Sequence, residues 1–218
     1  ASRGALLLNH MEATGLLREA GQVRGLRVRN KETGADLELR ARCVVNATGV
    51  WVDEVRQMDR DAGAPQARPM VAVQRIVAPS QGVHLIVDRK FLPGSHAMLV
   101  PKTEDGRVMF AVPWLGKTIL GTTDTPREDL AREPAAFSQD VGFILHEAGR
   151  YLAMAPQRSD VRSVWVGLRP LVKPVGEDGG NTKALSREHT VLISASGLVT
   201  VTGGKWTTYR SMAEDVLE

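Results

Sequence analysis

The chain has 218 residues, a formal net charge of +3 and a single cysteine, and 43% of its residues are hydrophobic. This is the composition of an ordinary globular chain, long enough for one large domain or for one domain and part of another, and it excludes a disordered or collagen-like chain. No run of about 18 consecutive apolar residues occurs, which excludes a membrane-spanning helix.

The charge and the cysteine content also limit the partners that we expect. Acidic and basic residues are mixed along the chain, so the small net charge gives little support for a nucleic-acid partner, and we expect none. Cys43 has no second thiol for a disulfide or a zinc site, and no two histidines stand at metal-ligand spacing, so no metal is predicted. A reducing cytoplasm is therefore the expected compartment.

The first part of the chain predicts a β-hairpin that leads into a sheet. Leu6–Leu8 is interpreted as a short buried strand. Apolar and charged residues alternate over 22–30 and 35–42, on either side of turn residues at 31–34, which predicts a hairpin with one solvated face. Cys43–Val45 is apolar on both faces and favours a strand that enters the middle of a sheet.

A glycine turn and a short helix are expected after this strand. Asn46-Ala47-Thr48-Gly49 forms the turn, and Val52, Val55 and Met58 share one face of the helix. Strand, glycine turn and helix bring the backbone close to a ligand at the carboxyl edge of a sheet. Residues 61–69 contain glycine and proline without periodicity, which indicates a linker and a domain boundary.

Residues 70–125 predict an antiparallel meander. Its β-rich runs are separated by turn residues, among them Pro79-Ser80-Gln81-Gly82. Runs so close in sequence require hairpins, because parallel pairing requires crossovers of about a dozen residues or more. The runs are Val71–Ala78, Val83–Val87, Ala97–Pro101, Arg107–Trp114 and Thr118–Thr122.

The remaining third alternates between helix and strand. An apolar stripe from Phe137 to Leu152 predicts a helix whose first turn contains Pro134. The elements expected after it are a strand over 161–172 interrupted at Arg169-Pro170, a loop over 176–181, a strand or hairpin over 190–202, and a helix that opens at Gly203-Gly204-Lys205 and continues to residue 218.

The Gly203-Gly204-Lys205 turn is the first candidate ligand site. Two glycines directly before a helix let bare backbone approach a ligand, and the helix start offers unpaired N–H groups to an anion or to the edge of an electron-rich ring. Lys205 adds a full positive charge that could hold a phosphate. A glycine hinge capped by threonine is the alternative interpretation.

Two further candidates are single side chains. Arg169 lies in a run without other charges, so it needs a carboxylate or phosphate partner, which is either a ligand or an internal acid. His84 begins an apolar strand, where an imidazole could act as a general base or be hydrogen-bonded within the core. Gly121-Thr122-Thr123-Asp124 is interpreted as a capped turn at the end of the meander.

Five segments together resemble the FAD-dependent glycerol-3-phosphate dehydrogenases. They are Val44–Trp51, Gly82–Val87, Ile119–Asp124, Gly167–Leu171 and Gly203–Arg210. The resemblance covers nearly the whole chain and implies an α+β fold of the D-amino-acid oxidase type, a partial FAD-binding domain with an inserted antiparallel substrate sheet. The implied domains are 1–68 and 173–218 for FAD, with a flavin-contacting loop and helix in the latter, and 69–172 for substrate.

The same resemblance implies a reaction and a set of site residues. A hydride passes from C2 of sn-glycerol 3-phosphate to flavin N5, which forms dihydroxyacetone phosphate, and the electrons go to quinone at the membrane surface. Carried over by position, His84, Arg169 and Lys205 are the catalytic and substrate-binding candidates, with His84 facing the substrate and the other two holding the phosphate or polarising the flavin. The residues expected to line FAD are Ala47, Thr48, Gly49, Trp51, Gly203, Gly204, Lys205, Trp206 and Thr207.

The sequence departs from the family in several places. Trp206 and Val50 stand where the family often has an aliphatic residue and proline. No G-x-G-x-x-G turn for the FAD pyrophosphate occurs, and the helical C-terminal extension is absent. Together with the start at Ala1-Ser2-Arg3, this predicts an internal fragment that alone is colourless and inactive, and that dimerises or aggregates through open strand edges.

Two other functions remain open at this point. One is an amino-acid oxidase-type flavoenzyme of the same fold, in which Arg169 binds a carboxylate. The other is a binding domain without catalysis that has lost the flavin half. For the parent enzyme we expect peripheral contact with the inner face of the membrane.

Overall fold

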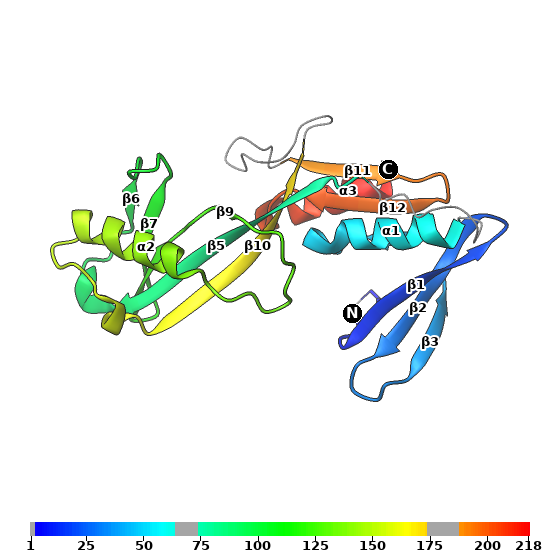
Figure 1. Cartoon of the computed structure of the whole chain (residues 1–218), viewed down its shortest axis with the longest axis horizontal. Helices are drawn as coiled ribbons and strands as arrows, with labels where there is room; N and C mark the ends of the chain where they lie inside the picture. The colour runs from blue at the N-terminus through cyan, green and yellow to red at the C-terminus, as the bar shows by residue number, and fades with distance from the viewer. Residues whose placement is uncertain (1–2, 64–73, 174–187) are drawn as a thin grey trace. The chain divides into compact units, whose positions relative to one another are not determined.

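The computed structural model describes residues 3–63, 74–173 and 188–218. The chain forms two compact units, which we call unit 1 (Ala1–Val77 and Ser186–Glu218) and unit 2 (Ala78–Leu185) (Figure 1). The linker predicted over 61–69 is wrong at residues 61–63, which are helical, and its remainder lies outside the described residues. The start of the run predicted from Val71 and the loop predicted over 176–181 also lie outside them. Within the described ranges, no helix is long and apolar enough to cross a membrane.

Unit 1 contains an antiparallel sheet near the N-terminus. Its strands are β1 (Met11–Glu19), β2 (Gln22–Asn30) and β3 (Asp36–Arg40), in the order β1-β2-β3. The predicted hairpin is therefore confirmed, whereas β1 was not predicted. The prediction of a buried strand at Leu6–Leu8 is wrong, because these side chains are exposed and pairing with β2 begins only at Met11.

A second sheet of unit 1 combines distant parts of the chain. It contains β11 (His189–Ile193), β12 (Leu198–Gly203) and β4 (Val44–Asn46), and β12 runs parallel to β4. A short 3-10 helix, η1 (Gly49–Trp51), and helix α1 (Val52–Gly63) follow β4, as predicted. The apolar core of this unit is formed by Leu16, Val23, Val44, Val55 and Leu198.

Strand β4 corrects one expectation. Val44 and Asn46 are buried, but Cys43 and Val45 are exposed, so the strand is not covered on both faces. In the part of the chain that the structure describes, β4 pairs only with β12 and ends the sheet.

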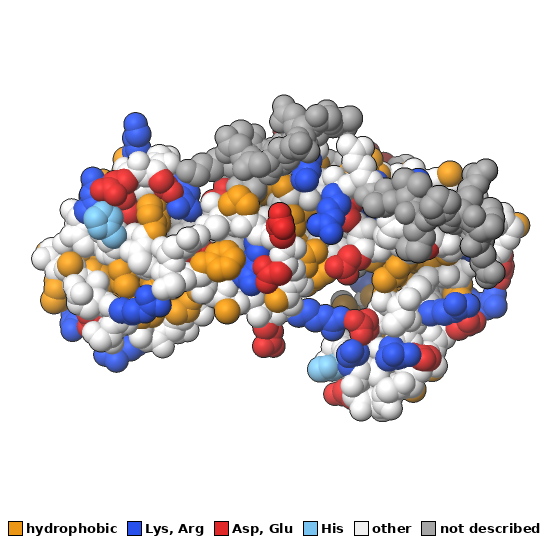
Figure 2. Space-filling view, in the orientation of Figure 1, with side chains coloured by type: hydrophobic (Ala, Val, Ile, Leu, Met, Phe, Trp, Pro, Cys, Tyr) orange, Lys and Arg blue, Asp and Glu red, His pale blue; other side chains and the backbone are white. Residues whose placement is uncertain are grey.

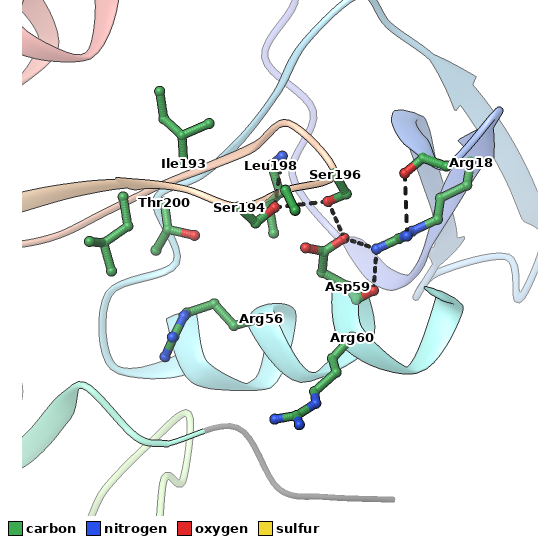
Figure 3. A pocket seen from close by; sticks show the side chains of 12 residues that line it. Arg18, Arg56, Asp59, Arg60, Ile193, Ser194, Ser196, Leu198 and Thr200 are labelled. Atoms are coloured by element: carbon green, nitrogen blue, oxygen red, sulfur yellow. Dashed lines mark hydrogen bonds and ion pairs between the residues drawn. The ribbon is translucent and has the colours of Figure 1, made fainter. Parts of the chain in front are cut away.

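A polar network joins three elements of unit 1 beside a cavity of about 560 Å³ (Figure 3). Asp59 of α1 accepts hydrogen bonds from Arg18 of β1 at 2.5 Å and from Ser196, in the turn between β11 and β12, at 2.6 Å. The Asp59 side chain is 9% exposed. The network therefore fixes the far end of α1 to both sheets.

We expect Asp59→Ala to lower the free energy of unfolding by about 2 kcal/mol, because Arg18 would lose its buried counter-charge and Ser196 its acceptor. Asp36→Ala is the matched control, since its ion pair with Arg29 lies in the open, and it should leave stability nearly unchanged. If urea unfolding showed the same loss of free energy of unfolding for Asp59→Ala and Asp36→Ala, the network would have no structural role.

Unit 2 is a single antiparallel sheet covered by one helix. Its strand order is β10-β5-β8-β7-β6, and the short β9 pairs with β5. Helix α2 (Ser138–Tyr151) packs on one face, where its Val141, Ile144 and Ala148 meet the sheet core. The strands are β5 (Val77–Asp88), β6 (Met98–Val100), β7 (Met109–Trp114), β8 (Lys117–Gly121), β9 (Thr125–Pro126) and β10 (Ser163–Val172).

The antiparallel meander is confirmed, but its details differ from the prediction. The predicted break at residues 79–82 lies inside β5, because Ser80 and Gln81 pair with β9 and their side chains are buried in hydrogen bonds. Strand β5 pairs with β8 and not with the next strand, β6. Strand β10 continues through Arg169-Pro170, since an edge strand tolerates a proline that cannot donate a hydrogen bond. Helix α2 begins at Ser138, one turn after Pro134.

Candidate active site

The sheet of unit 2 presents His84 on the face opposite to α2. Side chains alternate along β5, and Val83 and Leu85 belong to the core under the helix, so Gly82 and His84 face the other way. Across the strand pair, His84 lies opposite Gly121 of β8. This face therefore brings together Gly82–Val87 and Ile119–Asp124, two of the five segments that carry the family resemblance.

Two glycines make room for the charged side chains on this face. A Cβ atom at Gly82 would lie 2.3 Å from Nη2 of Arg169. A Cβ atom at Gly121 would lie 2.7 Å from Cδ2 of His84 and 2.8 Å from the Val83 carbonyl oxygen. Side chains at either position would occupy the space of Arg169 or His84, so the glycines define the shape of the site.

Arg169 is held by the turn that follows β8. Its Nη1 donates to the Thr123 carbonyl oxygen at 3.0 Å and lies 3.4 Å from Oδ1 of Asp124, and its Nη2 donates to Oγ1 of Thr122 at 3.0 Å. The Asp124 carboxylate also accepts a hydrogen bond from Ser80. An internal acid is thus one partner of Arg169, and these bonds fix its guanidinium with 27% of the side chain exposed.

The turn at 121–124 consequently does more than the predicted capping. Thr123 accepts a hydrogen bond from the Val83 backbone N–H at 3.0 Å, while Thr122 and Asp124 orient Arg169. The sequence had no signal for this role, because residues 122–124 and 169 are far apart along the chain.

The surroundings of His84 favour its neutral form. Burial, and second to it the positive charge of Arg169, lower the pKa of His84 from its ordinary value of 6.5. A neutral imidazole at pH 7 can accept a proton, which is the property required of a general base.

We expect Gly82→Ala to raise the KM for a phosphorylated substrate about 10- to 100-fold, because the added methyl group displaces the Arg169 guanidinium without removing its charge. Gly167→Ala is the control. Gly167 lies on the same strand as Arg169, and a Cβ there meets open space. Steady-state kinetics of both variants test this expectation. If Gly82→Ala and Gly167→Ala had the same KM, the position of the Arg169 guanidinium would not matter for substrate binding.

Unit 1 places two glycine turns at one sheet edge. Strands β4 and β12 are parallel, with Asn46 opposite Thr200, so the turn at Ala47–Gly49 and the turn at Gly203–Lys205 both follow the carboxyl ends of neighbouring strands. Gly49 and Gly203 have left-handed φ values of 63° and 79°. The predicted FAD-lining residues in these two turns therefore share an edge.

Asn46 fixes the first of these turns. Its buried side chain donates from Nδ2 to the Val52 carbonyl oxygen at 3.0 Å and to Oγ1 of Thr200 at 3.3 Å, and its Oδ1 accepts from Oγ1 of Thr48 at 2.8 Å. Asn46 was not predicted as a site residue, although it is the first residue of the predicted turn. Its partners Val52 and Thr200 are visible only in the folded chain.

In the second turn the structure shows the threonine cap, which was one of the two interpretations, and the contact with a ligand stays a prediction. Thr208 caps it, since the Lys205 N–H donates to its hydroxyl at 3.3 Å, and Gly203 and Gly204 are left-handed. Lys205, Trp206 and Thr207 are nevertheless exposed at the edge, and Trp206 stacks on Tyr209 with ring centres 5.6 Å apart. Helix α3 (Tyr209–Leu217) follows the short 3-10 helix at Trp206–Thr208.

The predicted site residues thus form two groups. His84 and Arg169 meet in unit 2, whereas Lys205 and the predicted FAD-lining residues belong to unit 1. That these two groups act together in one reaction stays a prediction.

The described residues contain one group of side chains with metal-ligand chemistry, Glu104, His146 and Glu147. Arg150 lies 3.4 Å from Glu104 and 3.2 Å from Glu147. Its guanidinium already provides the cation for both carboxylates, so this cluster is better explained as an ion-pair network.

The fold and the two groups define a class of flavoprotein. Residues 1–210 match the family described as FAD dependent oxidoreductase, and the chain belongs to this family. The human mitochondrial glycerol-3-phosphate dehydrogenase is 44% identical over the whole chain, and the Schizosaccharomyces pombe enzyme is 42% identical over 98% of it. The chain spans 29% and 34% of these two relatives.

Solved structures give the same assignment of fold. The glycerol-3-phosphate dehydrogenase from Bacillus halodurans complexed with FAD is similar, with a TM-score of 0.82 and 33% identity. The match covers 99% of this chain and 39% of the chain of that enzyme. The L-alpha-glycerophosphate oxidase from Mycoplasma pneumoniae, at 14% identity and a TM-score of 0.60, shows the fold alone. The predicted mixed helix-and-sheet class with antiparallel sheets is confirmed.

Proposed function

We propose that the whole protein oxidises sn-glycerol 3-phosphate to dihydroxyacetone phosphate with FAD and passes the electrons to quinone. The observation that carries this proposal is the placement of Arg169 over Gly82, on the same sheet face as a neutral His84. A fixed guanidinium suits a phosphate, and a neutral imidazole suits the proton of an alcohol. The names of the similar dehydrogenases support the same substrate.

The two turns of unit 1 fit FAD. Left-handed glycines at 49, 203 and 204 let the backbone approach a ligand at one edge, and Lys205, Trp206 and Thr207 are exposed beside them. In the proposed complex Ala47–Trp51 and Gly203–Thr207 hold the flavin, and Lys205 places a positive charge beside it. When bound, FAD supplies the acceptor for the hydride from C2.

The roles of this chain's side chains follow from that arrangement. Arg169 binds the substrate phosphate, and Thr122 and Asp124 keep it oriented. His84 accepts the C2 hydroxyl proton at a ring nitrogen while the C2 hydride leaves, so that the alcohol becomes a ketone and the electrons balance. Quinones dissolve in the bilayer, so we further propose peripheral contact of the whole protein with the inner face of the membrane.

Anaerobic flavin bleaching tests the proposal. Glycerol 3-phosphate should bleach the flavin of the whole protein at much lower concentration than free glycerol, whereas amino acids should not bleach it. Bleaching by amino acids would favour the amino-acid oxidase-type alternative, and no bleaching by any of them would favour a binding domain without catalysis. Faster reoxidation by a soluble quinone than by oxygen would support the proposed acceptor.

A further inference from the structure

A side-chain hydrogen bond joins α3 to the start of β11. His189 is the first residue of β11, and its Nε2 lies 2.5 Å from Oδ2 of Asp215 in the last turn of α3. The two side chains are 23% and 45% exposed. This contact therefore joins α3 directly to β11.

This pair lies directly beside the second glycine turn of unit 1. His189 pairs with Gly203 in the sheet, and a Cβ atom at Gly204 would lie 2.5 Å from Sδ of Met212 and 3.2 Å from Cβ of His189. Gly204 is therefore enclosed between the first residue of β11 and α3, which lies along β11 and β12 (Figure 1). The φ value of +72° at Gly204 confines this position to glycine as well.

We propose that His189 and Asp215 are positioning residues for the cofactor, which act by holding α3 against β11 and thereby fixing the turn at Gly203–Lys205. The inference rests on the proposed function, in which this turn contacts FAD. A turn that is already ordered before binding loses less entropy when the cofactor binds. The hydrogen bond between His189 and Asp215 thus stabilises a turn whose two glycines are by themselves flexible.

The Asp215→Asn variant of the whole protein tests this role. We expect its Kd for FAD to rise about tenfold, and its flavin midpoint potential to become more negative because the N–H groups and Lys205 stabilise the reduced flavin less well. In the FAD-free variant, the backbone amides of 204–208 should exchange with deuterium faster than in the wild type. Asp215→Glu keeps the charge and should restore most of the affinity.

Glu214→Gln is the matched control. Glu214 lies next to Asp215 on α3, but its partner Arg210 is on the same helix, at 3.4 Å, with both side chains exposed. This variant should change neither the Kd, nor the potential, nor the exchange rates, and melting temperatures identify any variant that fails to fold.

Two outcomes overturn the inference by different routes. If Asp215→Asn had the Kd for FAD and the flavin midpoint potential of the wild type, the pair would not position the cofactor, even if amide exchange were faster. A wild-type protein that binds no FAD would refute the proposed function, and the inference would fall with it. The wild-type measurement therefore separates the two failures.

Discussion

Replacement of Arg169 by alanine should raise the KM for glycerol 3-phosphate about 10- to 100-fold, since a hydrogen-bonded charge contributes about 1.5 to 3 kcal/mol and each 1.4 kcal/mol is a factor of ten. Free glycerol has no phosphate, so its KM should change much less. The comparison of the two substrates separates the loss of phosphate binding from general damage to the site.

The residue directly before the strand that contains Arg169 offers a control. Arg162 precedes β10 and is also paired with an aspartate, Asp88, but that pair is at the surface. Arg162→Ala should leave both KM values unchanged. If Arg169→Ala affected glycerol and glycerol 3-phosphate equally, Arg169 would have no part in binding the phosphate.

Replacement of His84 by glutamine should lower kcat about 10²- to 10⁴-fold, the usual contribution of a general base. Glutamine keeps a polar side chain of similar length in the space that Gly121 leaves, so folding should be preserved. The substrate KM should change little, because Arg169 and its partners remain in place.

The pH dependence tests the same role. Because the pKa of His84 lies below 6.5, the imidazole is neutral above that pH, and kcat/KM should be flat around pH 7 and fall only on the acid side of 6.5. His84→Gln should lose this acid limb. His146→Gln, an exposed histidine in the network with Glu104, should retain it. An unchanged acid limb in His84→Gln would assign the titration to another group.

Much of the local structure could be predicted from the sequence. The hairpin of β2 and β3 follows from alternating apolar and charged residues, and α2 follows from apolar residues at helical spacing. The glycine turns at 47–49 and 203–205 were also identified, and their contact with a ligand stays a prediction. These features depend on neighbours within a few residues, which is the range over which periodicity and turn chemistry act.

Strand partners and buried polar contacts could not be predicted. Strand β5 appeared to end at Pro79 because Ser80, Gln81 and Gly82 are turn residues, but pairing with β9 and bonds to Asp124 and Asp140 keep them extended. Leu6–Leu8 looked like a strand, yet no partner strand meets it in the described chain. Partners outweigh local preference in both cases.

The sequence by itself therefore predicted the residues that could do chemistry, His84, Arg169 and Lys205, and the two glycine turns of unit 1. Only the tertiary structure decided that Arg169 lies over Gly82 and is held by Thr122 and Asp124, that Asn46 joins one turn to Thr200, and that His189 contacts Asp215 beside the other. The reason is physical: each of these contacts joins residues far apart in the chain, and their distances are fixed by strand order and packing, which local sequence patterns do not specify.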